Sequence, residues 1–202
     1  FFTNDFKVNS DKGYIAYAPG VYYYGIVKGD NNSLVSISFF DNDVAGIVST
    51  EVIGNIVLGK VKNSLDFVSY NDNKLKGGNQ FSCAADQLPE NKNIDLPKYD
   101  PEMLKTTMTD NCVRTYYELT NKSLRDNANS NAQTTNWITA IHNNISTLYV
   151  NDGITVAVSE IFIWQTQDPY TGDYNANLSA FRVNRPTFNG DFAHLVNTVY
   201  ST

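Results

Sequence analysis

Apolar side chains recur at every second position between residues 154 and 168, and this stretch predicts the centre of the fold. One parity carries Ile154, Val156, Val158, Phe162 and Trp164, and the other carries Thr155, Ala157, Ser159, Ile161 and Ile163. Because both faces are apolar or small, the pattern predicts a strand that is buried on both sides. Such a strand requires neighbouring strands on both edges and packed layers above and below. Glu160 interrupts one face, and its charge needs a partner, for which Arg114 and Arg182 are candidates.

Short alternating segments recur at intervals of about ten residues in the first part of the chain. They comprise residues 14–17, 21–27, 34–40, 45–49, 55–60 and 66–70. No helical period is present here, and the regular spacing predicts an antiparallel meander or a small barrel. In the third segment, apolar residues alternate with Ser36 and Ser38, which predicts one face turned inward and one turned outward.

The chain changes character after the last of these segments. Residues 76–111 are polar, contain three prolines among charged residues and predict a linker, which includes Cys83. From residue 112 onward, strand and helix patterns alternate, with strands at 113–119, 154–168 and 192–200 and helices at 135–150 and 178–183. The sequence therefore predicts an α+β chain in three parts, with a β-rich domain over residues 1–75, the linker over 76–111 and an α/β-like domain over 112–202.

The composition of the chain argues against some classes of binding partner. A net charge of −6 argues against nucleic acid and anionic membranes as main partners. The longest apolar runs are much shorter than the roughly 20 residues of a membrane span. The sequence begins at Phe1 rather than at a methionine, which predicts a processed or trimmed product.

Two sets of motifs follow one another along the chain. The second half contains residues 113–119 (VRTYYEL), 158–164 (VSEIFIW) and 191–195 (DFAHL). In this order they resemble segments of the catalytic domain of the reprolysin or adamalysin group of zinc metalloproteases. The first half contains residues 24–29 (YGIVKG), 33–38 (SLVSIS) and 46–48 (GIV), which resemble the propeptide of the same enzymes. The two sets stand in the order of a zymogen.

The resemblance implies that the chain is the N-terminal segment of a secreted, extracellular zinc metalloendopeptidase. Residues 1–75 would then be an inhibitory, propeptide-like domain, and residues 112–202 would be the N-terminal half of a zincin-like catalytic domain. The implied partners are the remainder of the catalytic domain and the protein or peptide substrates of the parent enzyme.

The zinc-binding motif of this family, HExxHxxGxxH, does not occur in the chain. The motif needs two histidines one helical turn apart and a third beyond a glycine turn. His142 and His194 are too far apart in the sequence, so each is interpreted as a hydrogen-bonded structural histidine. The zinc ligands of the parent would lie beyond Thr202, and the chain is not expected to hydrolyse peptides by itself.

The two cysteines have three interpretations. The resemblance implies that Cys83 is an inhibitory switch whose thiolate occupies the open coordination position of the zinc, although the glycine that usually follows this cysteine is an alanine here. A disulfide between Cys83 and Cys112 is the alternative, and it would close a loop of about 30 residues and stabilise the fold by about 3 to 4 kcal/mol. Two inert free thiols are the third interpretation.

Two carboxylates also have two interpretations each. By resemblance, Glu118 and Asp168 are candidate ligands of a structural Ca²⁺, a cation that prefers carboxylate oxygens. The alternative is that Asp168 caps the following turn and that Glu118 is a hydrogen-bonded structural acid.

A non-enzymatic function stays open beside the protease. The missing zinc motif fits a pseudoprotease or a β-rich binding or assembly module. A sheet that lacks its remaining strands would expose an open edge, and an open edge invites self-association.

Overall fold

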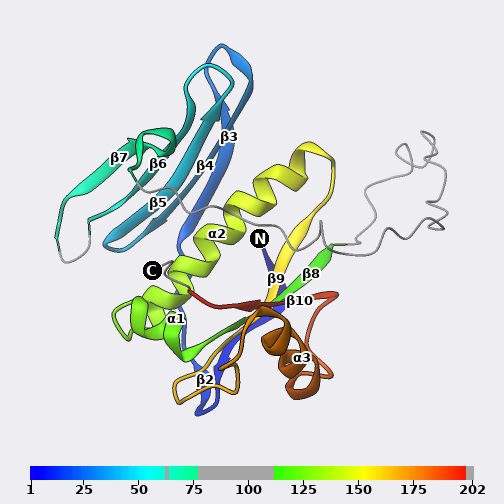
Figure 1. Ribbon diagram of the computed structural model, residues 1–202. Helices are drawn as coiled ribbons and strands as arrows, with labels where there is room; N and C mark the ends of the chain where they lie inside the picture. The colour runs from blue at the N-terminus through cyan, green and yellow to red at the C-terminus, as the bar shows by residue number, and fades with distance from the viewer. Residues whose placement is uncertain (62–63, 77–111, 199–202) are drawn as a thin grey trace, which may run out of the picture.

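The computed structural model of the protein describes residues 1–61, 64–76 and 112–198, which form two five-stranded sheets with helices (Figure 1). Sheet A contains β1 (Phe2–Ser10), β2 (Gly13–Ile15), β8 (Val113–Leu119), β9 (Val156–Ile163) and β10 (Phe192–Val196). Sheet B contains β3 (Val21–Val27), β4 (Asp30–Phe40), β5 (Asp43–Thr50), β6 (Gly54–Lys60) and β7 (Phe67–Asn71). The helices are the short 3-10 helix η1 (Asp72–Lys74), α1 (Asn121–Asp126), α2 (Asn131–Asn151) and α3 (Tyr174–Asn184). The predicted α+β class is confirmed.

β9 is the central strand of sheet A, whose order is β10-β8-β9-β1-β2. β8 and β1 both pair with β9 in parallel, so Tyr117 and Val8 flank Ile161 from opposite sides. β10 continues the parallel arrangement beside β8, whereas β2 is antiparallel to β1. The side chains of Val158, Ile161 and Ile163 are fully buried. The prediction of a central strand that is buried on both faces is therefore confirmed.

Sheet B is an antiparallel meander in which each strand pairs with the next strand along the chain. Glycines allow its tight turns, since Gly29 and Gly54 have φ angles of 87° and 78°, which favour a residue without a side chain. Within the described residues, β3 and β7 each pair on one edge only. Of the two predicted arrangements, an antiparallel meander and a small barrel, the described strands therefore form the open meander.

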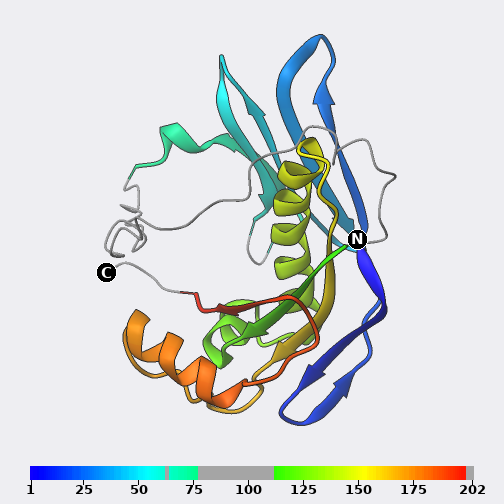
Figure 2. The same ribbon diagram turned by 90° about the vertical axis from the view of Figure 1, so that its right-hand side faces the viewer.

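Helix α2 lies between the two sheets (Figures 1 and 2). Towards sheet A, Ile138 belongs to a buried cluster with Leu119, Val158 and Ile161, and Trp137 packs against the same cluster. The opposite face of sheet A packs against α3, through a second cluster formed by Tyr116, Tyr170 and Phe181. The layers therefore run from α3 through sheet A and α2 to sheet B.

The side of α2 that faces sheet B is polar. Thr135, Thr139, Asn143 and Thr147 recur at four-residue steps and are all buried. Each threonine hydroxyl donates to a backbone carbonyl one turn earlier in the helix, so these groups are satisfied without a partner in the sheet. Asn143 Nδ2 instead lies 3.2 Å from Ser38 Oγ, 3.2 Å from the carbonyl oxygen of Tyr23 and 3.3 Å from that of Ile37. This amide fixes the helix on sheet B.

Ser36 and Ser38 of β4 are buried on the side of α2, whereas Val35, Ile37 and Phe39 face away from the helix. Ser36 and Ser38 are almost fully buried on the side of α2. Val35 and Ile37 belong to the opposite face, where they align with Val48 and Gly46 of β5. The predicted alternation of two faces is therefore present in β4. The face that carries Ser36 and Ser38 is the one that is turned inward, towards α2. The reason is that α2 offers hydroxyls and an amide, not apolar side chains, to this sheet.

The predicted grouping of residues 1–75 in one β-rich domain differs from the sheet topology at its N-terminal end. Residues 2–15 form β1 and β2 of sheet A, in which their neighbours are β9 and, beyond it, β8. Val8 is 1% exposed and packs in the same cluster as Leu119 and Ile161. The chain therefore leaves sheet A between β2 and β3 and returns to it between β7 and β8. Apart from residue 76, the predicted linker lies outside the described residues.

Candidate functional site

Glu118 of β8 is the centre of a buried polar cluster. Its side chain is fully buried, and each carboxylate oxygen accepts two hydrogen bonds. The four donors are Tyr170 Oη at 2.6 Å and Trp164 Nε1 at 2.7 Å on Oε1, and Arg185 Nε at 2.6 Å and Tyr116 Oη at 2.8 Å on Oε2. These residues come from β8, the loop after β9 and the end of α3, so one carboxylate joins three segments.

The electrostatics of this cluster favour an ionised Glu118. Burial by itself raises the pKa of the carboxyl group, but the hydrogen bonds from Arg185, Tyr170, Trp164 and Tyr116 outweigh it and hold the pKa below its usual value. The guanidinium carbon of Arg185 also lies 4.4 Å above the centre of the Phe162 ring, which adds a cation–π contact. Burial raises the pKa of Tyr116 and Tyr170, so both phenols stay protonated and donate.

Asp168 lies beside this cluster and caps backbone groups. It accepts hydrogen bonds from the N–H of Asn121, at the start of α1, and from the N–H of Tyr170. Tyr170 thus connects the two acids, through its N–H to Asp168 and its hydroxyl to Glu118. This geometry agrees with the structural interpretation of both residues, in which Asp168 is a cap and Glu118 is a hydrogen-bonded acid.

The calcium site stays a prediction. Both Glu118 oxygens are already engaged by two donors each, so a Ca²⁺ ion would have to displace protons that stabilise the ionised acid. A cavity of about 430 Å³ at Asp168 is lined in addition by Lys122 and Arg125, whose positive charges oppose a cation there. Among residues 1–61, 64–76 and 112–198, no group of three or more metal-ligating side chains is arranged to hold a metal ion.

Glu160 is paired with a basic side chain, as predicted, but this side chain is Lys7 and not one of the two expected arginines. Its carboxylate lies 3.3 Å from Lys7 Nζ and accepts a hydrogen bond of 2.9 Å from Asn9 Nδ2. Both partners come from β1, which the register places directly beside β9 at Lys7 and Glu160. Arg114, one of the two expected partners, pairs instead with Asp5. The error follows from the missed position of β1.

His142 and His194 both contact Tyr117. His142 Nδ1 lies 2.9 Å from the hydroxyl of Tyr117, and the His194 ring is stacked on the Tyr117 ring at 5.4 Å. Burial lowers the pKa of His142 to about 4. His142 is thus a neutral, fully buried residue that is hydrogen-bonded to Tyr117, as the sequence predicts.

The pKa of His142 has a consequence for stability below neutral pH. The unfolded chain binds a proton at the ordinary histidine pKa near 6.5, whereas the folded chain binds it near 4. The free energy of unfolding is therefore expected to fall by up to about 3 kcal/mol as the pH decreases through this window. Urea unfolding of the protein at about pH 7 and about pH 5 measures the first part of this change, about 2 kcal/mol.

The variant His142→Gln isolates that contribution. It cannot titrate, so its stability is expected to change less between the two pH values than that of the natural chain. His194→Gln removes the second histidine, whose pKa burial also lowers, and measures its separate share of the pH dependence. An equal pH dependence in the natural chain and His142→Gln would contradict the assignment.

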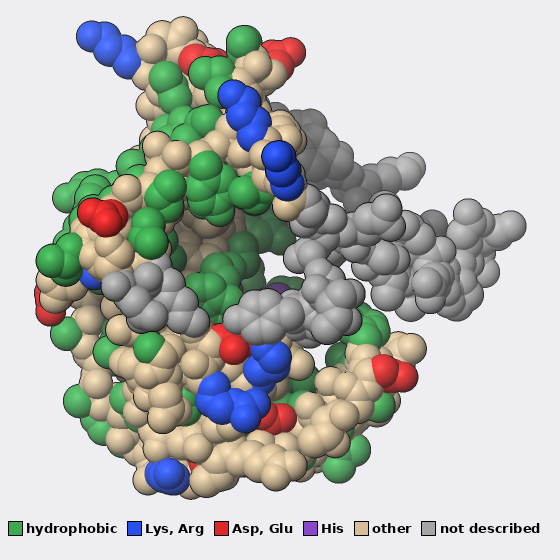
Figure 3. Space-filling model, turned by 60° about the vertical axis from the view of Figure 1, so that its left-hand side comes forward, with side chains coloured by type: hydrophobic (Ala, Val, Ile, Leu, Met, Phe, Trp, Pro, Cys, Tyr) green, Lys and Arg blue, Asp and Glu red, His purple; other side chains and the backbone are tan. Residues whose placement is uncertain are grey.

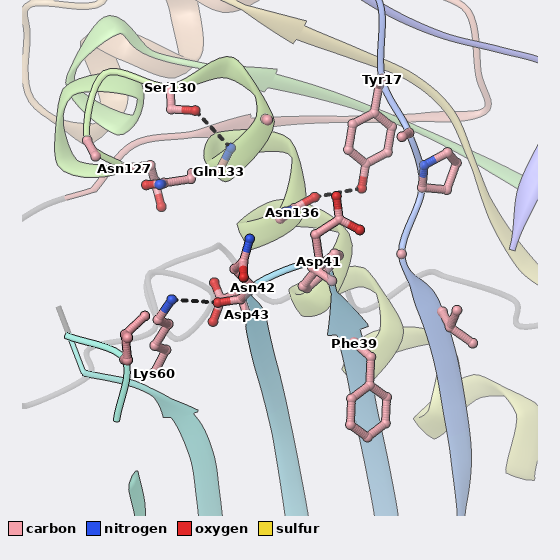
Figure 4. A pocket seen from close by; sticks show the side chains of 18 of the residues that line it. Tyr17, Phe39, Asp41, Asn42, Asp43, Lys60, Asn127, Ser130, Gln133 and Asn136 are labelled. Carbon is pink, nitrogen blue, oxygen red and sulfur yellow. Dashed lines mark hydrogen bonds between the residues drawn. The ribbon is translucent and has the colours of Figure 1, made fainter. Parts of the chain in front are cut away.

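A cavity larger than the one at Asp168 lies away from all these residues, where the ends of β4, β5 and β6 approach the N-terminal part of α2 (Figure 4). It has a volume of about 1060 Å³, and Asp41, Asp43, Lys60 and Asn136 are among its lining residues. Several of its polar groups bind one another, since Lys60 Nζ donates to the carbonyl of Asn42 and Tyr17 Oη donates to Asn136 Oδ1. Sequence patterns gave no signal for this cavity, because its walls come from turns of both sheets.

The predicted roles of the cysteines are only partly accessible to the structure. Cys112 is half-buried immediately before β8 and forms no disulfide with another described residue. Cys83 lies outside the described residues. The disulfide and the inhibitory switch therefore both stay predictions.

Comparison with known proteins adds no relative. No protein-family model matches the chain, and no curated protein matches it either. Within the described ranges, the chain has no helix that is both long and apolar enough to cross a membrane.

Proposed function

We propose that the chain is the N-terminal segment of a secreted zinc metalloendopeptidase zymogen of the reprolysin type. One observation carries the proposal. The three motifs that resemble consecutive catalytic-domain segments lie on β8, β9 and β10, which are parallel strands of one sheet in the order β10-β8-β9. Helices on opposite faces of the sheet connect these strands, α2 before β9 and α3 before β10.

The propeptide-like motifs support the same proposal, because they lie in one compact unit. Residues 24–29, 33–38 and 46–48 fall on β3, β4 and β5 of sheet B, and this sheet is docked on α2. In the proposed zymogen, sheet B masks the catalytic unit and assists its folding. The strand β1, which precedes sheet B in the chain, fills the edge of β9 and so joins both units.

The proposed chemistry belongs to the parent enzyme. There a zinc ion would activate a water molecule for attack on a peptide carbonyl, and the zinc ligands would follow this chain in the sequence. Within the described residues, β10 pairs on one edge only, so further strands of the catalytic domain could continue the sheet there.

Peptidase assays test the proposal. The chain of 202 residues is expected to show no chelator-sensitive hydrolysis of a protein or peptide substrate. The longer product of the same gene is expected to show it after removal of the propeptide-like part. A gene without an HExxHxxGxxH motif downstream of Thr202, or zinc-dependent peptidase activity of this chain alone, would contradict the proposal.

A non-enzymatic binding or assembly module is the second candidate. The observation that favours it is the apolar outer face of sheet B, where Val21, Tyr23 and Phe39 are about half exposed or more. Under this alternative, the longer gene product would bind partners without hydrolysing them.

A further inference from the structure

The strand β3 is an unusual edge strand. It has seven residues, VYYYGIV, without a charge or a proline, and within the described residues it pairs with β4 alone. The other edge strands are shorter, with five residues in β7 and β10 and three in β2. Natural proteins usually protect sheet edges with charges, prolines or short strands, because an open edge recruits other strands. β3 has none of these protections along Val21–Gly25.

The side chains of β3 are exposed on both faces of sheet B. Tyr23 on the outer face is 58% exposed, and Tyr24 on the side of α2 is 62% exposed. Ile26 is also largely exposed. In Figure 3, hydrophobic side chains gather over the upper part of the molecule, which sheet B forms. A strand placed beside β3 would therefore cover apolar surface on two faces besides pairing with its backbone.

We propose that β3 is a self-association edge, at which two copies of the chain pair their β3 strands antiparallel about a two-fold axis at Tyr24. A second copy is the partner that fits because an antiparallel pair of identical strands closes on itself and needs no other component. The chain carries a net charge of −6, so most contacts between two copies bring like charges together. The uncharged β3 avoids this repulsion.

The two-fold axis fixes the register. Tyr24 lies opposite its own copy and Tyr23 opposite Gly25, within the part of β3 that pairs regularly with β4. Tyr22 opposite Ile26 and Val21 opposite Val27 follow outward, where the pairing of β3 with β4 shifts in register between Gly25 and Val27. An aromatic ring across from a glycine covers the exposed glycine backbone, and an aromatic residue across from a β-branched one is a favourable cross-strand pair. The pair of Tyr24 residues on the axis occurs once in the dimer, and every other pair occurs twice. The two copies of sheet B then form one continuous sheet of ten strands.

The dimer is expected to be weak. A contact between two strand edges buries less than the roughly 1,000 Å² of a stable interface, so the dissociation constant should be about micromolar or larger. This inference does not depend on the protease proposal, since it concerns only the composition and exposure of β3.

Sedimentation velocity of the full chain, from about one micromolar to several hundred micromolar, tests the inference. The natural chain is expected to shift from monomer to dimer over this range. Tyr24→Lys places two ammonium groups opposite each other at the axis and is expected to weaken dimerisation at least about tenfold. Circular dichroism and the unfolding midpoint check that the variant is folded.

Two lysine variants serve as matched controls. Tyr174→Lys changes a similarly exposed tyrosine on α3, and Phe192→Lys changes an exposed residue on β10, the edge strand of sheet A. Both should dimerise like the natural chain. The inference is overturned if the natural chain stays monomeric throughout, if folded Tyr24→Lys dimerises unchanged, or if Phe192→Lys alone abolishes the dimer.

Discussion

Replacement of Glu118 by alanine is expected to lower the free energy of unfolding by about 3 to 5 kcal/mol. The change leaves the partly buried guanidinium of Arg185 without its anion and removes the acceptor of three further donors. Such uncompensated groups cost more than the net value of the interactions themselves. Denaturant unfolding followed by the fluorescence of Trp164, which donates to Glu118, measures the loss directly.

Two companion variants sharpen this measurement. Glu118→Gln keeps the shape but removes the charge, and its loss is expected to be about 1.5 to 3 kcal/mol. Glu51→Ala changes an exposed acid in the turn between β5 and β6 and should stay within about 0.5 kcal/mol of the natural chain. If Glu118→Ala lowered the free energy of unfolding by less than about 1 kcal/mol, the conclusion that this carboxylate stabilises the fold would be contradicted.

The contribution of Glu118 also depends on pH with a definite sign. Its pKa is lower in the folded chain than the ordinary value of 4.5, so the folded state favours the ionised form. The stabilisation is complete above the ordinary carboxyl pKa and is lost as the pH falls through the lower, folded value. The difference between the natural chain and Glu118→Ala is therefore expected to shrink in acid.

Replacement of Val8 by aspartate is expected to destabilise sheet A by more than about 4 kcal/mol. The side chain of Val8 is 1% exposed and packs among Leu119, Ile161 and other apolar residues, where a carboxylate finds no partner. Because Val8 belongs to a strand at the start of the chain, this variant tests whether residues 2–15 are an integral part of the sheet. Trp137 and Trp164 pack against the two faces of sheet A and report its unfolding.

Tyr14→Asp is the matched control for this substitution. Tyr14 lies on β2 in the same hairpin and is 74% exposed, so an added carboxylate there stays in water. Its effect is expected to stay within about 0.5 kcal/mol. If Val8→Asp were equally mild, the pairing of β1 with β9 would not contribute to the stability of sheet A.

The sequence predicts two strands to the residue, whereas the central strand expected at 154–168 is shorter and comprises Val156–Ile163. The strands at 21–27 and 113–119 have the bounds of β3 and β8, because alternation of side chains is local and turn or polar residues end it. The helix predicted at 135–150 is longer in the structure, where Ser130 caps α2 and its hydroxyl accepts from the N–H of Gln133. The first turn of that helix has little apolar content, so a search for apolar periodicity misses it.

The sequence does not predict partners that depend on distant segments. β1 has mixed polarity, and only its position beside β9 explains why Lys7 and Asn9 neutralise Glu160. Likewise, Arg185 reaches Glu118 because α3 crosses the sheet and ends above it, a geometry that no spacing in the sequence encodes. The polar inner face of sheet B has the same origin, since α2 determines which side of β4 is buried.

The parallel pairing of β1 with β9 has a consequence for how the protein is made. Asn9 and Glu160, which share a hydrogen bond, are 151 positions apart in the sequence, whereas neighbouring strands of sheet B are consecutive. Contacts between distant positions form slowly, because the intervening chain must be ordered first. During synthesis, the meander can therefore assemble early on the ribosome, while the first strand waits for its partner to be translated. The N-terminal hairpin is accordingly secured in the sheet only after β9, at Val156–Ile163, has been synthesised.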